Sequence, residues 1–255
     1  MISGSFEAIN ASRNEELHLS IISNNLANIS VAGFKKDRLA FESLLRNQLN
    51  SEVPESPGGQ VVQDLQLYRR LVKVSTDLGQ GNLRQTGNPL DLALSGPGFF
   101  KVNTPQGVRY TRNGSFKLTQ DGMIVTQSGA PVLGKSGPIN ASNASGGEIT
   151  VDEQGAVFVD GNLVDTLSLA TFAPSVRLEK EGNSLYRPGP DAVEGTKGEG
   201  ETVVGQGYLE ESNVQATEEL IQMLYTVRAY ESYQKMIRSL ADIDSKAVND
   251  AGRLK

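Results

Sequence analysis

The chain has 255 residues, of which 38% are hydrophobic and 6% aromatic, with no tryptophan and a formal net charge of −6. These values allow one large domain or two modest ones with a thin or divided core, and no basic stripe indicates nucleic-acid binding. Because cysteine is absent, disulfides, thiolate catalysis and Cys-based metal sites are excluded. The sequence also predicts no transmembrane helix and no cleaved secretory signal.

The N-terminal segment is predicted to be a helix of about 30 residues. Apolar residues recur at helical spacing in two runs, residues 2–9 and 17–29. Gly33 is a natural stop, because glycine tolerates the left-handed conformation that ends helices. Residues 34–50 are compatible with a short helix or an extended arm, and the Pro- and Gly-rich residues 54–59 predict a flexible break.

The middle of the chain is predicted to be β-structure. Residues 61–68 alternate with period two, and short apolar segments follow between glycine-containing turns. The predicted strands are 90–94, 99–102, 108–111, 115–118, 123–126, 149–151, 156–159 and 163–172. The predicted two-residue turns are Asp121-Gly122, Asp160-Gly161 and Asn113-Gly114. Regular spacing of such strands favours a small barrel or sandwich, and residues 136–147 and 187–202 have the composition of loops.

The C-terminal segment is predicted to be a long helix with a narrow apolar seam. Ser212 or Asn213 is the expected N-cap, and Glu218 and Glu219 suit the positive end of the helix dipole. A heptad pattern has eight apolar residues among ten seam positions. The seam comprises Leu220, Met223, Val227, Tyr230, Gln234, Ile237, Ala241, Asp244, Val248 and Ala251. Such a stripe needs a partner helix, and the N-terminal segment is the obvious candidate.

These elements predict an α+β fold. Long N- and C-terminal helices would form a coiled-coil-like helical domain, with a central, mainly β domain resembling a barrel or sandwich. The predicted division is an N-terminal helix at 1–33, a connecting arm with an extended or β segment at 34–78, a β domain at 79–208 and a C-terminal helix at 209–255.

Catalytic equipment is scarce in this sequence. His18 is the one histidine, within the N-terminal helix, and is expected to be a polar surface residue. The glycine pairs at 79–81 and 96–98 are expected to be structural turns, because neither precedes the Lys-Ser/Thr pair of a phosphate loop. The sequence therefore predicts a structural protein without metal or cofactor rather than an enzyme.

Several ordered blocks resemble the rod and hook proteins of the bacterial flagellum. They are residues 23–36 (SNNLANISVAGFKK), 88–102 (NPLDLALSGPGFFKV), 110–116 (YTRNGSF), 207–214 (GYLEESNV) and 228–235 (RAYESYQK). The resemblance is closest to the proximal-rod, FlgF-type members. The chain is too short for a hook protein, the region around residues 58–61 is shorter than in distal-rod members, and Tyr233 stands where those members more often have Asn.

The resemblance implies a subunit of the basal-body rod, stacked with copies of itself and with other rod proteins into a helical drive shaft in the periplasmic space. It also implies export by the flagellar type III apparatus without a cleaved signal, and no cofactor or direct membrane span. The expected assembly interface is Asn24, Asn25, Leu26, Asn28, Ile29, Gly33, Phe34, Leu220, Met223, Val227, Tyr230, Gln234, Ile237 and Ala241. The alternatives are a distal-rod subunit, a β-rich binding module on a helical stalk, and a hydrolase with two buried carboxylates.

Overall fold

The chain folds into two compact units. In this computed structural model, the helical unit comprises Met1–Ala27, Asp37–Asp77 and Gln215–Lys255, and the β unit comprises Asn28–Lys36 and Leu78–Val214. The structure describes residues 2–41, 72–141, 147–173, 176, 178–189, 194–196 and 202–252. The predicted strand at 61–68, the break at 54–59 and most of the predicted arm lie outside the described residues. The predicted division at residues 33, 78 and 208 stays a prediction about folding units.

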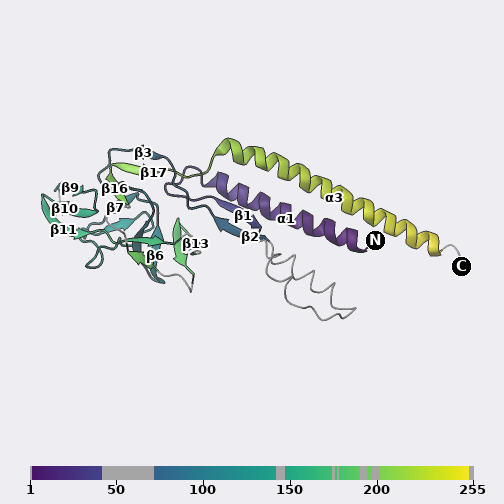
Figure 1. The fold of residues 1–255 in the computed structure, drawn as a ribbon, viewed down its shortest axis with the longest axis horizontal. Helices are drawn as coiled ribbons and strands as arrows, with labels where there is room; N and C mark the ends of the chain where they lie inside the picture. Colours follow the sequence, from purple (N-terminus) through teal and green to yellow (C-terminus); the bar gives the residue numbers. More distant parts are fainter. Residues whose placement is uncertain are drawn as a thin grey trace. The chain divides into compact units, whose positions relative to one another are not determined.

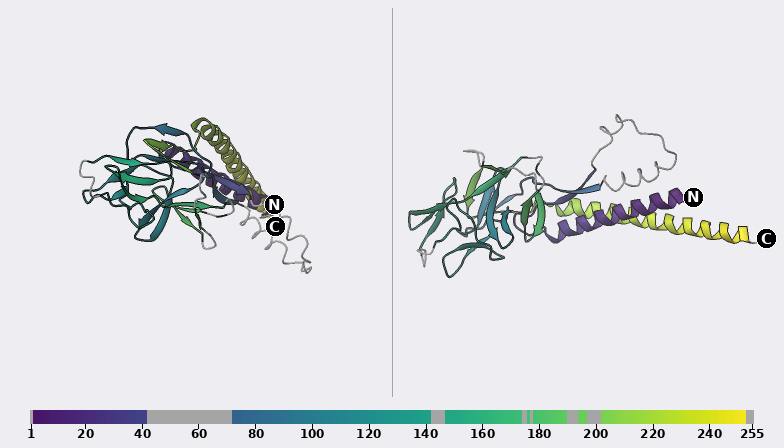
Figure 2. Two further views of the ribbon diagram at one scale, coloured as in Figure 1. Left: turned by 60° about the vertical axis from the view of Figure 1, so that its left-hand side comes forward. Right: turned by 90° about the horizontal axis from the view of Figure 1, so that it is seen from below.

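The helical unit contains helices α1 (Ile2–Ala27) and α3 (Ala216–Gly252), which lie side by side (Figures 1 and 2). A hairpin of β1 (Asp37–Phe41) and β2 (Val72–Thr76) pairs antiparallel, with Asp37 opposite Thr76, and β1 contacts α1. Neither described helix is long and apolar enough to cross a membrane.

Each helix differs from the prediction at one end. Helix α1 ends at Ala27, six residues before Gly33. Helix α3 begins at Ala216, with the expected acidic first turn, but after both predicted caps. The hydroxyl of Ser212 accepts a bond of 3.2 Å from the Val214 amide, and the side-chain oxygen of Asn213 accepts one of 2.7 Å from the Lys36 amide. These side chains fix the chain before the helix instead of capping it.

The predicted α+β fold with a coiled-coil-like helical domain is wrong. The described residues form two helices and seventeen strands. Two predicted seam residues, Leu220 and Val227, are 51% and 36% exposed, whereas the polar Glu219 and Thr226 beside them are buried. Neighbouring residues on a helix point about 100° apart. A heptad count finds apolar residues but does not show which side of the helix the partner covers. At these two positions the side that faces α1 is displaced by one residue from the predicted seam, so Leu220 and Val227 point outward.

The β unit contains fifteen of the described strands, divided among five sheets rather than one barrel or sandwich. The largest sheet has the order β13-β14-β6-β5-β12-β15, and the others are β11-β10-β9, β16-β4, β17-β3 and β7-β8. The strands are β3 (Leu83–Gln85), β4 (Leu92–Ser95), β5 (Phe99–Thr104), β6 (Gly107–Thr111), β7 (Phe116–Leu118), β8 (Ile124–Thr126), β9 (Ile149–Val151), β10 (Ala156–Val159), β11 (Asn162–Thr166), β12 (Leu169–Phe172), β13 (Leu178–Gly182), β14 (Leu185–Pro188), β15 (Glu194–Thr196), β16 (Val203–Gln206) and β17 (Tyr208–Glu210).

Alternation along β5 divides the core into two clusters. Phe100 and Val102 enter the larger cluster, where the Phe100 ring meets Phe116 edge-on at 5.2 Å between centroids. Phe99 points to the opposite face and meets the Tyr186 ring at 5.5 Å in a smaller cluster. Side chains of successive strand residues point to opposite faces, so one strand serves both clusters.

Each predicted strand segment between 90 and 172 contains a strand, and 163–172 contains most of β11 and all of β12. The turn at Asp160-Gly161 is confirmed, because both residues have positive φ, at 50° and 80°. The turn at Asn113-Gly114 is wrong. Neither residue has positive φ, and a Cβ on Gly114 would overlap the backbone of Leu92. Glycine is needed there for close approach rather than for a hairpin.

Candidate functional site

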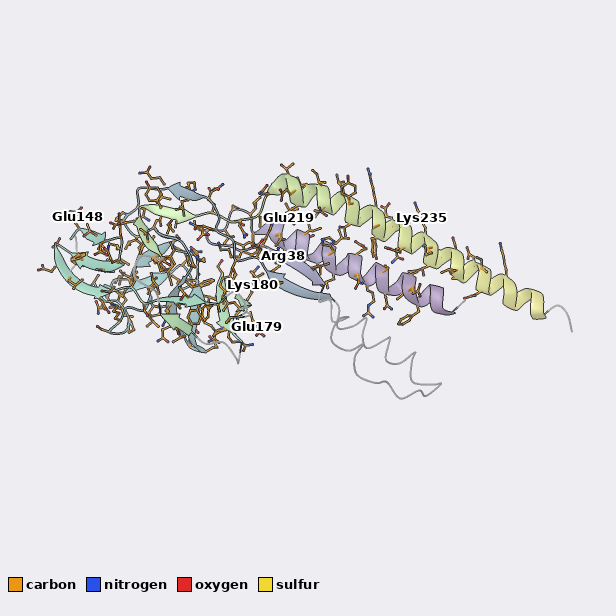
Figure 3. All side chains as sticks on the ribbon, in the orientation of Figure 1. Arg38, Glu148, Glu179, Lys180, Glu219 and Lys235 are labelled. Carbon is orange, nitrogen blue, oxygen red and sulfur yellow. The ribbon has the colours of Figure 1, made fainter. Side chains whose placement is uncertain are left out.

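Asn25 is the polar centre of the helical unit. Its side chain is buried, and its amide nitrogen donates to the backbone oxygen of Asp37 at 2.9 Å and to Glu219 at 3.3 Å. Its amide oxygen accepts from the Asp37 backbone nitrogen at 2.9 Å. One side chain therefore binds both backbone groups of a β1 residue, as a neighbouring strand would, and also holds the first turn of α3. Figure 3 labels Glu219 on α3.

Two further polar contacts join α1 to α3. His18 Nδ1 lies 3.3 Å from the hydroxyl of Thr226, and the Gln234 amide donates to the Ser12 hydroxyl at 3.0 Å. Together with the Asn25 contact, these bonds show that the helices run antiparallel, because the residue numbers rise along one helix as they fall along the other. His18 was expected to be a plain surface residue, but it contacts the buried Thr226 of the other helix.

We expect Asn25→Leu to lower the free energy of unfolding by about 2–4 kcal/mol. Leucine has the same number of side-chain heavy atoms, branched in the same way, but leaves the Asp37 backbone groups without this partner, and a buried polar group left unsatisfied costs about 1–3 kcal/mol. Chemical denaturation followed by far-UV circular dichroism measures the change. Asn14→Leu is the matched control, because Asn14 is an exposed residue of the same helix. Equal losses in both variants would contradict the role of Asn25.

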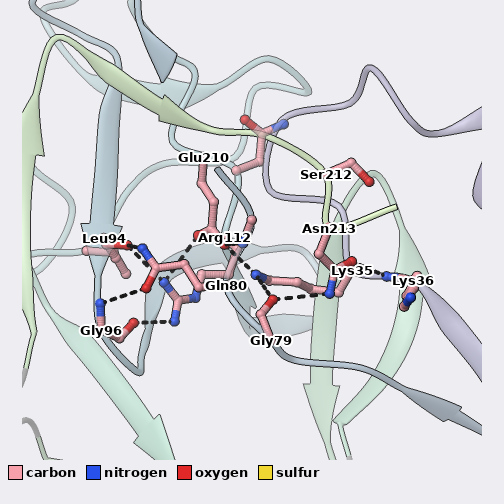
Figure 4. Close-up of polar contacts among 12 residues, drawn as sticks. Lys35, Lys36, Gly79, Gln80, Leu94, Gly96, Arg112, Glu210, Ser212 and Asn213 are labelled. Carbon is pink, nitrogen blue, oxygen red and sulfur yellow. Dashed lines mark hydrogen bonds and ion pairs between the residues drawn. The ribbon is translucent and has the colours of Figure 1, made fainter. Parts of the chain in front are cut away.

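A second polar site lies inside the β unit, and we call it the junction: Gly33, Lys35, Gly81, Arg112 and Glu210. Lys35, Arg112 and Glu210 are 0%, 4% and 1% exposed. One oxygen of the Glu210 carboxylate pairs with the Lys35 ammonium, and the other lies 3.2 Å from Arg112 Nη1 (Figure 4). The Gly81 amide donates to the first oxygen at 2.8 Å. Two cations from distant segments thus share one buried carboxylate.

Backbone carbonyls also accept hydrogen bonds from the two cations. Lys35 donates to the Gly79 oxygen at 2.7 Å, and Arg112 donates to the oxygens of Leu94 and Gly96 at 3.3 and 2.6 Å. Burial lowers the pKa of the Arg112 guanidinium, and the charge of Glu210 opposes this shift. The carboxylate therefore favours the charged form of a group that burial alone disfavours.

Glycine is required at the junction because backbones approach closely. Gly33 has a φ of +66°, and its amide donates to the Glu210 backbone oxygen at 2.7 Å. A Cβ on Gly33 would overlap the backbone of Arg112 and Asn113, and one on Gly81 would overlap that of Glu211. Gly33 therefore serves a crossing of chain segments rather than the end of a helix.

The N-terminal part of the junction is also fixed by groups around it. Lys180 donates to the Lys35 backbone oxygen at 2.6 Å, and its ammonium lies 4.2 Å from the centre of the Phe34 ring. Asn213 bonds in both directions, since its amide nitrogen donates to Gly79 at 3.1 Å and its side-chain oxygen accepts from Lys36. The segment 33–36 is thereby tied to the residues that precede α3.

The residues predicted to form the assembly interface belong to both units, and their role in assembly stays a prediction. Asn25 is buried in the helical unit, and Gly33 and Phe34 are buried in the β unit. On α3, Leu220, Val227 and Ala241 are exposed, whereas Met223, Tyr230, Gln234 and Ile237 are half-buried; before the junction, Asn24 is exposed and Leu26, Asn28 and Ile29 are half-buried. Sequence reasoning missed Lys35, Arg112 and Glu210, although each stands inside one of the ordered blocks that carry the resemblance.

Both sites tie distant parts of one chain together. Family models match in three places: "Flagella basal body rod protein" at residues 8–35, "Flagellar hook protein FlgE/F/G D1 domain" at 93–159, and "Flagellar basal body rod FlgEFG protein C-terminal" at 206–250. Lys35, Arg112 and Glu210 fall in one matched region each. Each of the three matched regions thus contributes one charged residue to the junction.

Curated relatives match over nearly the whole chain. The flagellar basal-body rod protein FlgG of Buchnera aphidicola subsp. Acyrthosiphon pisum is 40% identical, over 88% of this chain and 90% of the relative. FlgG of Bacillus subtilis is 30% identical over 98% and 99%, and FlgF of Caulobacter vibrioides is 32% identical over 92% of each. The chain belongs to the flagellar basal-body rod protein family.

Proposed function

We propose that this chain is a non-catalytic subunit of the flagellar rod that associates with copies of itself and with other rod proteins. Its membership of the rod protein family carries this proposal. The structure supports it with a fold whose polar sites bind segments of the same chain, and with an apolar surface on α3 that is suited to a neighbouring subunit.

The apolar surface occupies the first turns of α3, and we call it the α3 patch: Leu220, Ile221, Leu224, Tyr225 and Val227. Leu224 and Tyr225 are 61% and 65% exposed. The buried residues Glu219 and Thr226 mark the side of α3 that faces α1. Helical geometry turns most of the α3 patch away from that side. Fully burying one such side chain contributes about 1.5–3 kcal/mol, so a neighbouring subunit that covered the patch would be held strongly.

A patch that binds a different surface of the next copy generates a head-to-tail contact. When the rotation between successive copies does not close a ring, repetition of that contact produces a helical assembly. The predicted interface also includes Asn24, which is exposed, and Leu26, Asn28 and Ile29, which are half-buried. Export through the flagellar type III apparatus and a place in the periplasmic part of the rod belong to the same proposal.

The position along the rod is a separate proposal. The sequence features that favour the proximal, FlgF-type position are the short segment around residues 58–61 and Tyr233. Relatives named FlgG and FlgF match with identities of 40% and 32%, which supports the family but not one position. Expression of this chain in strains that lack either protein tests the proposal, because motility should return in the strain that lacks FlgF.

Isolation of basal bodies tests the proposed function itself. The chain should remain with purified basal bodies after detergent extraction, in several copies per particle by quantitative mass spectrometry. Recovery in the soluble fraction alone, from cells that assemble complete flagella, would contradict the proposal.

A further inference from the structure

The three charged members of the junction come from segments that are far apart in the sequence. Lys35 and Glu210 are separated by 175 residues, and Arg112 and Glu210 by 98. Lys35 belongs to the segment that follows α1, and Glu210 to the segment that leads into α3. Both ion pairs found at the junction end on the single Glu210 carboxylate.

The two terminal segments, which are residues 33–36 after α1 and residues 210–213 before α3, also bind each other directly. Two of these bonds join backbone groups: the Gly33 amide donates to the Glu210 backbone oxygen at 2.7 Å, and the Asn213 backbone amide donates to the Phe34 backbone oxygen at 3.3 Å. In a third, the Lys36 backbone amide donates to the side-chain oxygen of Asn213. Displacing either segment therefore leaves donors or acceptors of the other without these partners. Such groups are costly to leave unsatisfied once buried.

Charge makes the three charged members of the junction unequal. Removing Lys35 leaves one cation with one carboxylate, and so does removing Arg112. Removing the charge of Glu210 instead leaves two buried cations, and Arg112 Nε already has no hydrogen-bond partner among the described residues. An uncompensated buried charge is far more destabilising than the loss of a balanced pair.

We propose that Glu210 is a latch that couples the two terminal segments, so that residues 33–36 stay docked in the β unit only while residues 210–213 are docked, and the reverse. The latch makes completion of the β unit depend on both of these segments. It acts within one subunit and does not depend on where in the rod that subunit lies.

Hydrogen exchange on the full-length chain tests the coupling. Glu210→Gln should accelerate exchange by about 100-fold or more at 33–36 as well as at 211–214, because breaking a buried charge pair is strongly destabilising. Glu211→Gln is the matched control, since Glu211 pairs with Arg84 at 3.1 Å and both side chains are about half exposed. That control should leave both segments unchanged. Acceleration confined to 211–214 in Glu210→Gln would overturn the latch.

The effect of Lys35→Met on hydrogen exchange should have opposite signs in the unchanged chain and in the Glu210→Gln variant. Lys35→Met should accelerate exchange at both segments in the otherwise unchanged chain. In the Glu210→Gln background the same substitution removes a buried cation that has lost the charge of Glu210, so it should slow exchange relative to Glu210→Gln alone. If Glu210→Gln fails to fold, Lys35→Met should restore folded protein. A Lys35→Met effect of the same direction and size in both backgrounds would refute the shared-carboxylate latch.

Discussion

Gly33→Ala is expected to destabilise the β unit by about 3 kcal/mol or more, whereas Gly87→Ala should cost only about 1 kcal/mol. The two glycines have similar backbone conformations, with φ of +66° and +74°. An L-residue there is strained by about 1–2 kcal/mol in either place. Only Gly33 faces backbone within reach of a Cβ, from Arg112 and Asn113, while a Cβ on Gly87 would meet nothing within 4 Å.

The comparison separates backbone strain from steric overlap. At Gly33 the neighbouring atoms belong to the backbone beside β6, so relief requires movement of the junction rather than of a flexible side chain. Overpacking of this kind adds about 1–3 kcal/mol to the strain. Chemical denaturation of both variants measures the difference. Equal losses would show that Gly33 is needed for its φ alone and that the crossing of segments at the junction is not tightly packed.

Leu224→Asp is expected to abolish rod assembly while leaving the isolated chain as stable as before. Leu224 is among the most exposed apolar residues of α3, so a charge at this position should remain in water in the monomer. In an assembly that covers the α3 patch, the same charge would be buried without a partner, which costs several kcal/mol. Every subunit repeats the defect, so its effect on a polymer is larger than on a single contact.

Ser232→Asp is the matched control for this substitution. Ser232 is exposed, lies eight residues further along the same helix, and receives the same added charge outside the α3 patch. Motility, electron microscopy of basal bodies and thermal denaturation of the purified chain should be compared at equal expression. Motile cells with normal rods in the Leu224→Asp strain would show that the patch is not an assembly surface.

Local patterns predicted the strands of the β unit well. Alternation and glycine-containing turns located β4 to β12 because these signals depend on neighbouring residues only. The Asp160-Gly161 turn is an example, since both residues need positive φ for a two-residue hairpin. The hairpin at Asn183-Ser184 shows the limit, because both residues have positive φ there, at 50° and 57°, without the usual glycine.

The junction could not be predicted from such patterns. Lys35, Arg112 and Glu210 are charged, and a charged residue is normally expected at the protein surface. Their burial depends on three segments meeting in the folded chain. The prediction of which α3 residues pack against α1 failed for a different reason. The heptad pattern identified the apolar side chains correctly, but the contacts of Asn25 with Glu219 and of His18 with Thr226 place polar residues against α1.

The central claim is that this chain is a building block of the rod, and electron microscopy of basal bodies from cells that lack it tests that claim most directly. Rods should be absent or truncated and should carry no hook, and complete rods should return when the chain is supplied again. Complete rods carrying hooks in cells that lack the chain would contradict it.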